Sequence, residues 1–180
     1  MKTQERQAGA KRAMQSGVGL LEPVHGLHVS DLMVRNVESC TPASDLTAAA
    51  MVMWRRDCGI VPVIDEPGER TVGVITDRDI CMAVATRGRP ASQISVGEVM
   101  SHEVFCCRPE DTLVSALDAM RTSKVRRLPV TDAEGRLRGM LSLNDVVIHT
   151  RALDSGRDAE PRVADVIQTL RAISEHRQAA

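Results

Sequence analysis

Aromatic side chains are almost absent from this chain, which has one tryptophan, one phenylalanine and no tyrosine in 180 residues. Proteins that bind single-stranded nucleic acid stack bases on several aromatic side chains, and Trp54 and Phe105 are too few for that. An excess of positive charge is also missing, because 23 basic residues face 24 acidic ones. Nucleic-acid-binding domains usually carry a basic excess, so a nucleic-acid partner is not expected.

Long apolar runs and paired cysteines are lacking as well. No stretch approaches the roughly 20 apolar residues of a membrane span, and the basic N-terminal segment is followed by no signal-peptide core. We therefore expect no membrane partner. The five cysteines are an odd number without a C-x-x-C pair, unlike the even set of a secreted disulfide framework. A reduced, cytoplasmic location is the expectation.

What the sequence does contain is a second copy of itself. Eight residue pairs are 67 positions apart: Met33/Met100, Pro42/Pro109, Leu46/Leu113, Ala49/Ala116, Met53/Met120, Pro62/Pro129, Asp65/Asp132 and Gly68/Gly135. After a one-residue gap, three further pairs are 66 apart: Gly73/Gly139, Thr76/Ser142 and Asp79/Asp145. Two copies are too few for a solenoid, so the pattern predicts a duplicated small domain with a shared core and paired clefts.

Local patterns predict the same order of elements in both copies. In the first copy, a helical turn at 30–33 precedes a strand at 37–41, which Pro42 ends. Apolar residues spaced i, i+3, i+4, i+7 from Leu46 predict a helix that Ser44 or Asp45 caps. Short apolar runs then predict two strands and a closing helix from Thr76. The expected strands are 60–64 and 71–75 in the first copy, and 125–130 and 137–141 in the second.

These patterns divide the chain into five parts. They are an N-terminal tail at 1–28, a first domain at 29–88, a linker at 89–95, a second domain at 96–152 and a C-terminal segment at 153–180. The C-terminal segment begins with a polar break and continues with an amphipathic stripe over 163–173. That stripe predicts a helix that either packs back on the module or binds a second copy or another partner.

Both copies resemble the CBS domain, the cystathionine-beta-synthase type. The resemblance rests on IVPVID at 60–65 with GVITDRDI at 73–80, on RLPVTD at 127–132 with GMLSLNDV at 139–146, and on the openings DLM and EVM. It implies an α/β (α+β) fold of two β-α-β-β-α domains packed with pseudo-twofold symmetry. It also implies a sensor without catalysis whose clefts bind adenosine-containing ligands, namely AMP, ADP, ATP or S-adenosylmethionine. Such modules often form homodimers or dock on an effector protein; a ligand-free interaction scaffold is the alternative.

The Ser/Thr-x-x-Asp motifs at the two closing helices allow two interpretations. Thr76 with Asp79, and Ser142 with Asp145, can form capping boxes. The same geometry also suits a nucleotide, because a helix N-terminus favours phosphate and a carboxylate accepts from ribose hydroxyls. The resemblance implies ribose binding by the two aspartates and phosphate-side contacts by the two hydroxyls.

Other candidates come from the strands and their flanks. The resemblance implies that apolar strand residues wall a purine, although such residues are more often core, and that two positions at strand–proline junctions line the same clefts. These candidates are Ile60, Val61, Pro62, Leu128 and Pro129 for the walls, and Thr41 and Cys107 for the junctions.

The copies differ in charge at one place. Arg126 and Arg127 align with Gly59 and Ile60, so a basic pair is present in one copy only. Arginine binds phosphate in a bidentate manner, so the two clefts cannot be chemically equal, unless the pair is a solvated surface feature. A second difference pairs Arg78 with Asn144.

Metal and enzyme chemistry receive little support. His102 lies near Cys106 and Cys107, but adjacent strand residues point to opposite faces and no zinc spacing occurs. Buried apolar cysteine is the simpler role. No nucleophile-elbow, Walker or Rossmann pattern is present, so we expect neither catalysis nor a catalytic cofactor.

Overall fold

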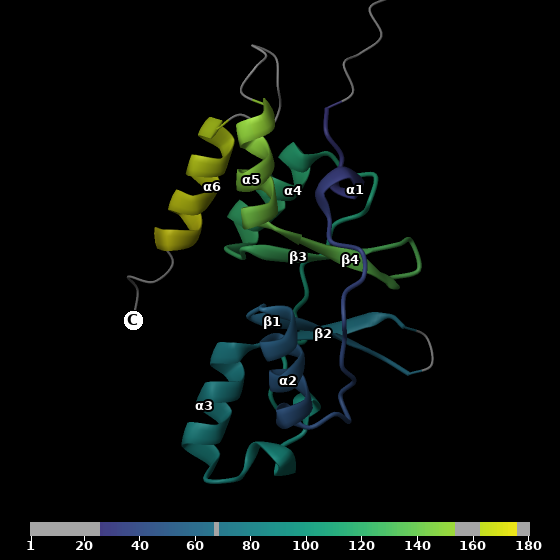
Figure 1. The fold of residues 1–180 in the computed structure, drawn as a ribbon, viewed down its shortest axis with the longest axis vertical. Helices are drawn as coiled ribbons and strands as arrows, with labels where there is room; N and C mark the ends of the chain where they lie inside the picture. The colour runs from purple at the N-terminus through teal and green to yellow at the C-terminus, as the bar shows by residue number, and fades with distance from the viewer. Residues whose placement is uncertain (1–25, 67–68, 154–162, 176–180) are drawn as a thin grey trace, which may run out of the picture.

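The computed structural model describes residues 26–66, 69–153 and 163–175. Residues 1–25 of the predicted tail and 154–162 of the polar break lie outside this range. The elements follow in this order: α1 (Val29–Leu32), α2 (Leu46–Arg56), β1 (Ile60–Ile64), β2 (Thr71–Thr76), α3 (Asp77–Arg87), η1 (Ala91–Gln93), η2 (Val96–Glu98), α4 (Leu113–Ser123), β3 (Arg127–Thr131), β4 (Leu137–Ser142), α5 (Leu143–Leu153) and α6 (Val163–Glu175). Figure 1 shows β1 and β2 with α2 and α3 in one half, and β3 and β4 with α4 to α6 in the other.

The two halves have the same sheet register. β1 pairs antiparallel with β2 and β3 with β4, and each sheet has two strands. Ile60 lies opposite Thr76 in one sheet, and Arg127 lies opposite Ser142 in the other. Each register shifts at the fourth pair, after Val63 and Val130. The halves therefore repeat with the 67-residue and 66-residue offsets found in the sequence.

The predicted strand at 37–41 is wrong, because this segment crosses from one repeat to the other. Val34 bridges Met140 in the second repeat, whereas Cys40 bridges Val63 in the first. Residues between the two bridges have no strand alongside, so only isolated bridges form. The matching segment of the second repeat crosses in the reverse direction, since Ser101 bridges Val74 and Cys107 bridges Val130.

The crossing exchanges core residues between the repeats. The openings of the two copies each pack in the core of the other. Val29, Leu32 and Met33 belong to the cluster around α4, β3 and β4, and Ile94, Val96 and Met100 belong to the cluster around α2, β1 and β2. The predicted linker at 89–95 thus contains the helix η1 and the fully buried Ile94. Each repeat completes its core with a segment from the other copy.

Two aligned glycines permit this close crossing. A Cβ atom at Gly139 would lie 2.5 Å from the Val34 carbonyl oxygen. A Cβ atom at Gly73 would lie 2.8 Å from Met100 Sδ and 2.9 Å from the Ser101 carbonyl oxygen. The crossing segments therefore approach β2 and β4 at positions where no side chain fits.

Helix α6 packs back on the second repeat, which confirms one of the two interpretations of its stripe. It contacts α4 and α5, and Val166 and Ile173 are buried in the second core. Figure 1 shows α6 beside α5. No helix within the described ranges is long and apolar enough to cross a membrane.

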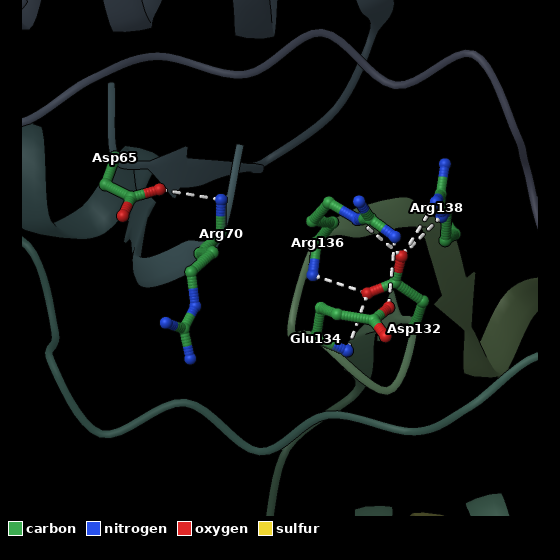
Figure 2. A network of polar contacts seen from close by, with 6 residues as sticks. All are labelled: Asp65, Arg70, Asp132, Glu134, Arg136 and Arg138. Atoms are coloured by element: carbon green, nitrogen blue, oxygen red, sulfur yellow. Dashed lines mark hydrogen bonds and ion pairs between the residues drawn. The ribbon is translucent and has the colours of Figure 1, made fainter. Parts of the chain in front are cut away.

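The hairpin turns join the repeats at the end remote from Thr76 and Ser142. The Thr71 amide donates to the Gly135 carbonyl at 3.0 Å, and the Leu137 amide donates to the Glu69 carbonyl at 3.1 Å. Figure 2 shows that Asp132 accepts hydrogen bonds from Arg136 and Arg138, whereas Asp65 accepts from the Arg70 amide. Desolvation opposes ionisation of Asp132, but its arginine partners outweigh this and hold its pKa below the ordinary value.

Candidate functional site

A cleft of about 320 Å³ lies where the first repeat meets the crossing segment and the start of β3. Its walls come from both repeats. The lining residues are Ile60, Val74, Thr76 and Asp79 from the first repeat, Ser101, Glu103, Val104 and Phe105 from the crossing segment, and Val125, Arg126, Arg127 and Pro129 from the second repeat. Six of the residues predicted from the sequence are thereby brought together: Ile60, Thr76, Asp79, Arg126, Arg127 and Pro129.

Thr76 and Asp79 form a complete capping box at the cleft. Oδ2 of Asp79 accepts from the Thr76 amide at 3.0 Å and from Thr76 Oγ1 at 2.6 Å, and the Asp79 amide donates to Thr76 Oγ1 at 3.2 Å. Within the described residues, Oδ1 of Asp79 accepts no hydrogen bond. A carboxylate has acceptor capacity on both oxygens, so Asp79 can cap α3 and still accept from a ligand.

The backbone amides of α3 are less available than the sequence suggests. Asp77 donates to the Gly59 carbonyl at 3.3 Å, Arg78 to the Asp77 carboxylate at 2.7 Å, and Asp79 to Thr76. The expectation that this helix end offers open N–H groups to phosphate is therefore not met. The cations that line this cleft are therefore those of side chains, Arg126 and Arg127.

Arg126 and Arg127 extend from the second repeat to the cleft that holds the first repeat's cap. Neither guanidinium forms an ion pair with any residue that the structure describes. By contrast, several other surface arginines form ion pairs, as Arg55 and Arg56 do with the single carboxylate of Glu38 at 3.0 and 2.7 Å. Two guanidinium groups without an ion-pair partner among the described residues therefore line the same cleft as the carboxylates of Asp79 and Glu103.

Comparisons with known proteins identify the family of this chain. The family model described as "CBS domain" matches residues 29–86 and 96–150. The chain belongs to the CBS-domain family. It is 31% identical over 131 residues to the CBS domain-containing protein YhcV of Bacillus subtilis, covering 73% of this chain and 91% of YhcV.

Solved structures agree on the fold of this CBS pair. A CBS-domain containing protein from Agrobacterium tumefaciens is 31% identical, with a TM-score of 0.61, and the match covers 69% of this chain and 99% of that one. CBSX2 of Arabidopsis thaliana in complex with AMP is 26% identical, also with a TM-score of 0.61, and the match covers 72% of this chain and 99% of that one. The first strand of the β-α-β-β-α order is here reduced to isolated bridges.

Several predicted residues of the CBS pair lie away from this cleft. Val61 and Leu128 are fully buried in the two cores, and Cys107 is buried with Leu128. Val61 and Leu128 point inward because they alternate along β1 and β3 with residues that face the cleft, such as Ile60 and Arg127. Burial raises the pKa of the Cys107 thiol to about 12. Pro62 is also buried.

The remaining predicted residues have their own environments. Thr41 is half-buried, and its hydroxyl lies 3.2 Å from Ser44 Oγ. Arg78 and Asn144 are exposed at the start of their helices. Ser142 and Asp145 repeat the capping box at α5, with the Ser142 hydroxyl donating to Asp145 at 2.7 Å, but they do not line the 320 Å³ cleft.

Sequence reasoning missed the crossing-segment wall, which contains Glu103, Val104 and Phe105. The sequence shows that residues 101–105 precede the Cys107–Pro109 junction. It does not show that this segment lies between the two repeats. Among the described residues no cluster of three or more potential ligands could hold a metal ion. Cys106 is exposed whereas Cys107 is buried, so their thiols do not converge.

Proposed function

We propose that this chain is a regulatory CBS pair that binds an adenosine nucleotide in the cleft between Asp79 and the Arg126–Arg127 pair. One observation carries the proposal: two arginines without carboxylate partners among the described residues lie on the same cleft as a carboxylate, one oxygen of which accepts no hydrogen bond from those residues. Such a combination suits a molecule that has both sugar hydroxyls and a phosphate.

In this proposal, each wall of the cleft contacts a different part of the ligand. Oδ1 of Asp79 accepts from the ribose hydroxyls, while the cap on Oδ2 holds the carboxylate in place. The adenine packs against the apolar walls, including Ile60, Val104 and Pro129. Phe105 supplies a ring face or edge for the base, in a chain otherwise poor in aromatics. Arg126 and Arg127 bind the phosphate.

The size of the cleft favours a mononucleotide. About 320 Å³ lies at the lower end of the range for small-molecule sites, roughly 300–1,000 Å³. AMP in the CBSX2 structure is consistent with this choice. ADP, ATP and S-adenosylmethionine remain the comparison ligands.

The position of the site suggests how binding is communicated. Asp79 belongs to the first repeat and the arginine pair to the second, so one ligand contacts both. Binding would thereby stabilise one arrangement of the repeats for an effector protein to recognise. The cleft supplies acceptors, cations and apolar walls, which suit binding rather than catalysis. The alternative is a scaffold that needs no ligand.

Isothermal titration calorimetry with AMP, adenosine, ADP, ATP and S-adenosylmethionine tests the proposal. AMP should bind and raise the melting temperature, because a ligand that binds only the native state stabilises it. Asp79→Asn should weaken AMP binding by about 1.5–3 kcal/mol, which raises Kd roughly tenfold to a hundredfold. Asp145→Asn is the matched control, since it alters the equivalent cap of α5, which does not line this cleft.

Replacing both arginines tests the phosphate assignment. Arg126→Gln with Arg127→Gln should reduce the preference for AMP over adenosine, and should also reduce the dependence of AMP affinity on salt. Unchanged preference would show that the pair is ordinary surface. If no member of the ligand panel binds, or if Asp145→Asn weakens AMP as much as Asp79→Asn, the assignment of this cleft is wrong.

A further inference from the structure

Two of the cysteines lie in one hollow of the first repeat. The hollow has a volume of about 510 Å³ between α2 and α3, and both Cys58 and Cys81 line it. Neither residue lines the cleft assigned to the nucleotide. Both thiols are free, with Cys58 half-buried and Cys81 exposed. The hollow therefore gives solvent access to a pair of thiols that the proposed function does not use.

The backbone brings the two cysteines close to each other. Gly59 follows Cys58, and a Cβ atom at Gly59 would lie 3.0 Å from Oδ2 of Asp77. The Asp77 amide also donates to the Gly59 carbonyl at 3.3 Å. Asp77 and Cys81 belong to α3 and are four residues apart, so they share one face of that helix. The chain at Cys58 thus lies next to the face of α3 that carries Cys81.

The second repeat has valine at both matching positions. Cys58 aligns with Val125 at the 67-residue offset, and Cys81 aligns with Val147 at the 66-residue offset. A buried cysteine packs as a small apolar side chain, much as valine does. Packing alone therefore does not require a thiol at either position, and the pair of thiols is a feature of the first repeat only.

The other three cysteines compete little for oxidation. Burial raises the pKa of the Cys40 thiol to about 11 and that of the Cys107 thiol to about 12. Both groups therefore stay protonated near neutral pH, and the thiolate is the reactive form. Desolvation also raises the pKa of Cys106, whose neighbour Cys107 is buried away from solvent.

We propose that Cys58 and Cys81 form a reversible disulfide on reaction with hydrogen peroxide, which links the end of α2 to α3. The more exposed Cys81 sulfur attacks the peroxide, so that an S–O bond forms, the O–O bond breaks and one water leaves. Cys58 then attacks the Cys81 sulfur, the S–S bond forms, the S–O bond breaks and a second water leaves. The two thiols lose two electrons, and the peroxide gains them.

A small, uncharged oxidant suits this hollow. Asp57 and Asp77 also line it, and neither forms an ion pair with any residue that the structure describes. These carboxylates repel an anionic oxidant such as glutathione disulfide, whereas hydrogen peroxide has no charge. The reaction uses neither Asp79 nor the arginine pair, so it does not depend on nucleotide binding.

Peptide mapping without a reducing agent tests the pairing. The tryptic peptides 57–70 and 79–87 contain one cysteine each, Cys58 and Cys81. After native chain has reacted with excess hydrogen peroxide, mass spectrometry should find these peptides joined, with the loss of two hydrogen atoms. Dithiothreitol should separate them again. The experiment uses dilute chain, so that bonds between molecules do not compete.

The single tryptophan gives an independent readout. Trp54 lines the same hollow, and a disulfide close to an indole quenches its fluorescence. Peroxide should lower the emission, and dithiothreitol should restore it. Cys58→Val with Cys81→Val gives the first repeat the residues of the second. This variant should keep the circular dichroism spectrum and melting profile but lose both the joined peptide and the reversible change in emission. Cys106→Ser, at another exposed cysteine, is the matched control and should change neither readout.

Four outcomes would overturn the proposal: peptides that stay separate while Cys81 proceeds to sulfinic acid, a covalent dimer through Cys81 in place of the internal bond, a joined peptide that forms only in urea, or equal loss of the bond in Cys106→Ser. The first and third would each show that the two thiols do not meet in the native fold.

Discussion

In the first repeat Gly59 and Ile60 lead into β1, whereas in the second repeat Arg126 and Arg127 occupy the matching positions. The outer helical faces differ too, since α6 covers the second repeat and leaves Trp54 of the first exposed. Yet the sheet registers are the same, and Thr76–Asp79 and Ser142–Asp145 form the same cap.

This difference separates two kinds of position. Residues at the backbone crossing and at the helix caps are the same or similar in the two repeats. A change at such a tight contact would disturb both repeats. Exposed residues have diverged, since surface substitutions usually change stability by less than about 0.5 kcal/mol. Divergence at the surface therefore leaves the basic pair in the second repeat only and the exposed Trp54 in the first repeat only.

The largest expected effect concerns α6, which only the second repeat possesses. Ile173→Ala removes a buried side chain from the second core and should lower the free energy of unfolding by about 2–4 kcal/mol. Hydrogen exchange should show the loss first in α4 and α5, with β1 and β2 less affected. Ile167→Ala on the exposed side of the same helix is the control. A uniform loss of protection in both repeats would contradict this division.

The next effect concerns the crossing shared by both repeats. Gly139→Ala should destabilise by about 1–3 kcal/mol, because its Cβ would meet backbone at 2.5 Å. Gly73→Ala should cost less, since its Cβ would meet backbone only at 2.9 Å, at the Ser101 carbonyl oxygen, and its closer contact is the flexible Met100 side chain. Urea denaturation measures both, with Gly26→Ala as a control that meets nothing within 4 Å. A larger loss of stability in Gly73→Ala than in Gly139→Ala would contradict the view that contact with backbone sets the cost at each crossing.

The smallest effect concerns the hairpin turns. Asp132 has a lowered pKa, so its ion pairs contribute stability above about pH 3.8, the ordinary pKa, and this contribution is lost as pH falls toward the folded-state value. Asp132→Asn should flatten the acid side of the melting-temperature profile between about pH 4 and pH 2. Asp65→Asn should alter that slope less, because Asp65 accepts from the Arg70 amide and binds no arginine side chain among the described residues. Identical profiles for the two variants would remove this distinction between the turns.

Local features could be predicted from the sequence because they depend on neighbours in the chain. The i, i+3, i+4 spacing after Leu46 and the Thr76-x-x-Asp79 motif each specify a helix start within a few residues. The duplication then applied the same assignment to the second copy. Four residues of the candidate cleft, Thr76, Asp79, Arg126 and Arg127, were singled out by the motif and the basic pair, which stand out without any tertiary information. Ile60 and Pro129 were predicted from the resemblance to the CBS domain.

The tertiary structure alone decided which repeat each segment completes. Alternating or helical periodicity shows that Val29, Leu32 and Met100 are apolar positions, but not that each packs with the other copy. It likewise could not show that Arg126 extends to the cleft of Asp79, nor that Phe105 closes it. These arrangements rest on contacts between residues far apart in the chain, such as Val34 with Met140, where steric fit at a glycine and burial of a shared core select the pairing.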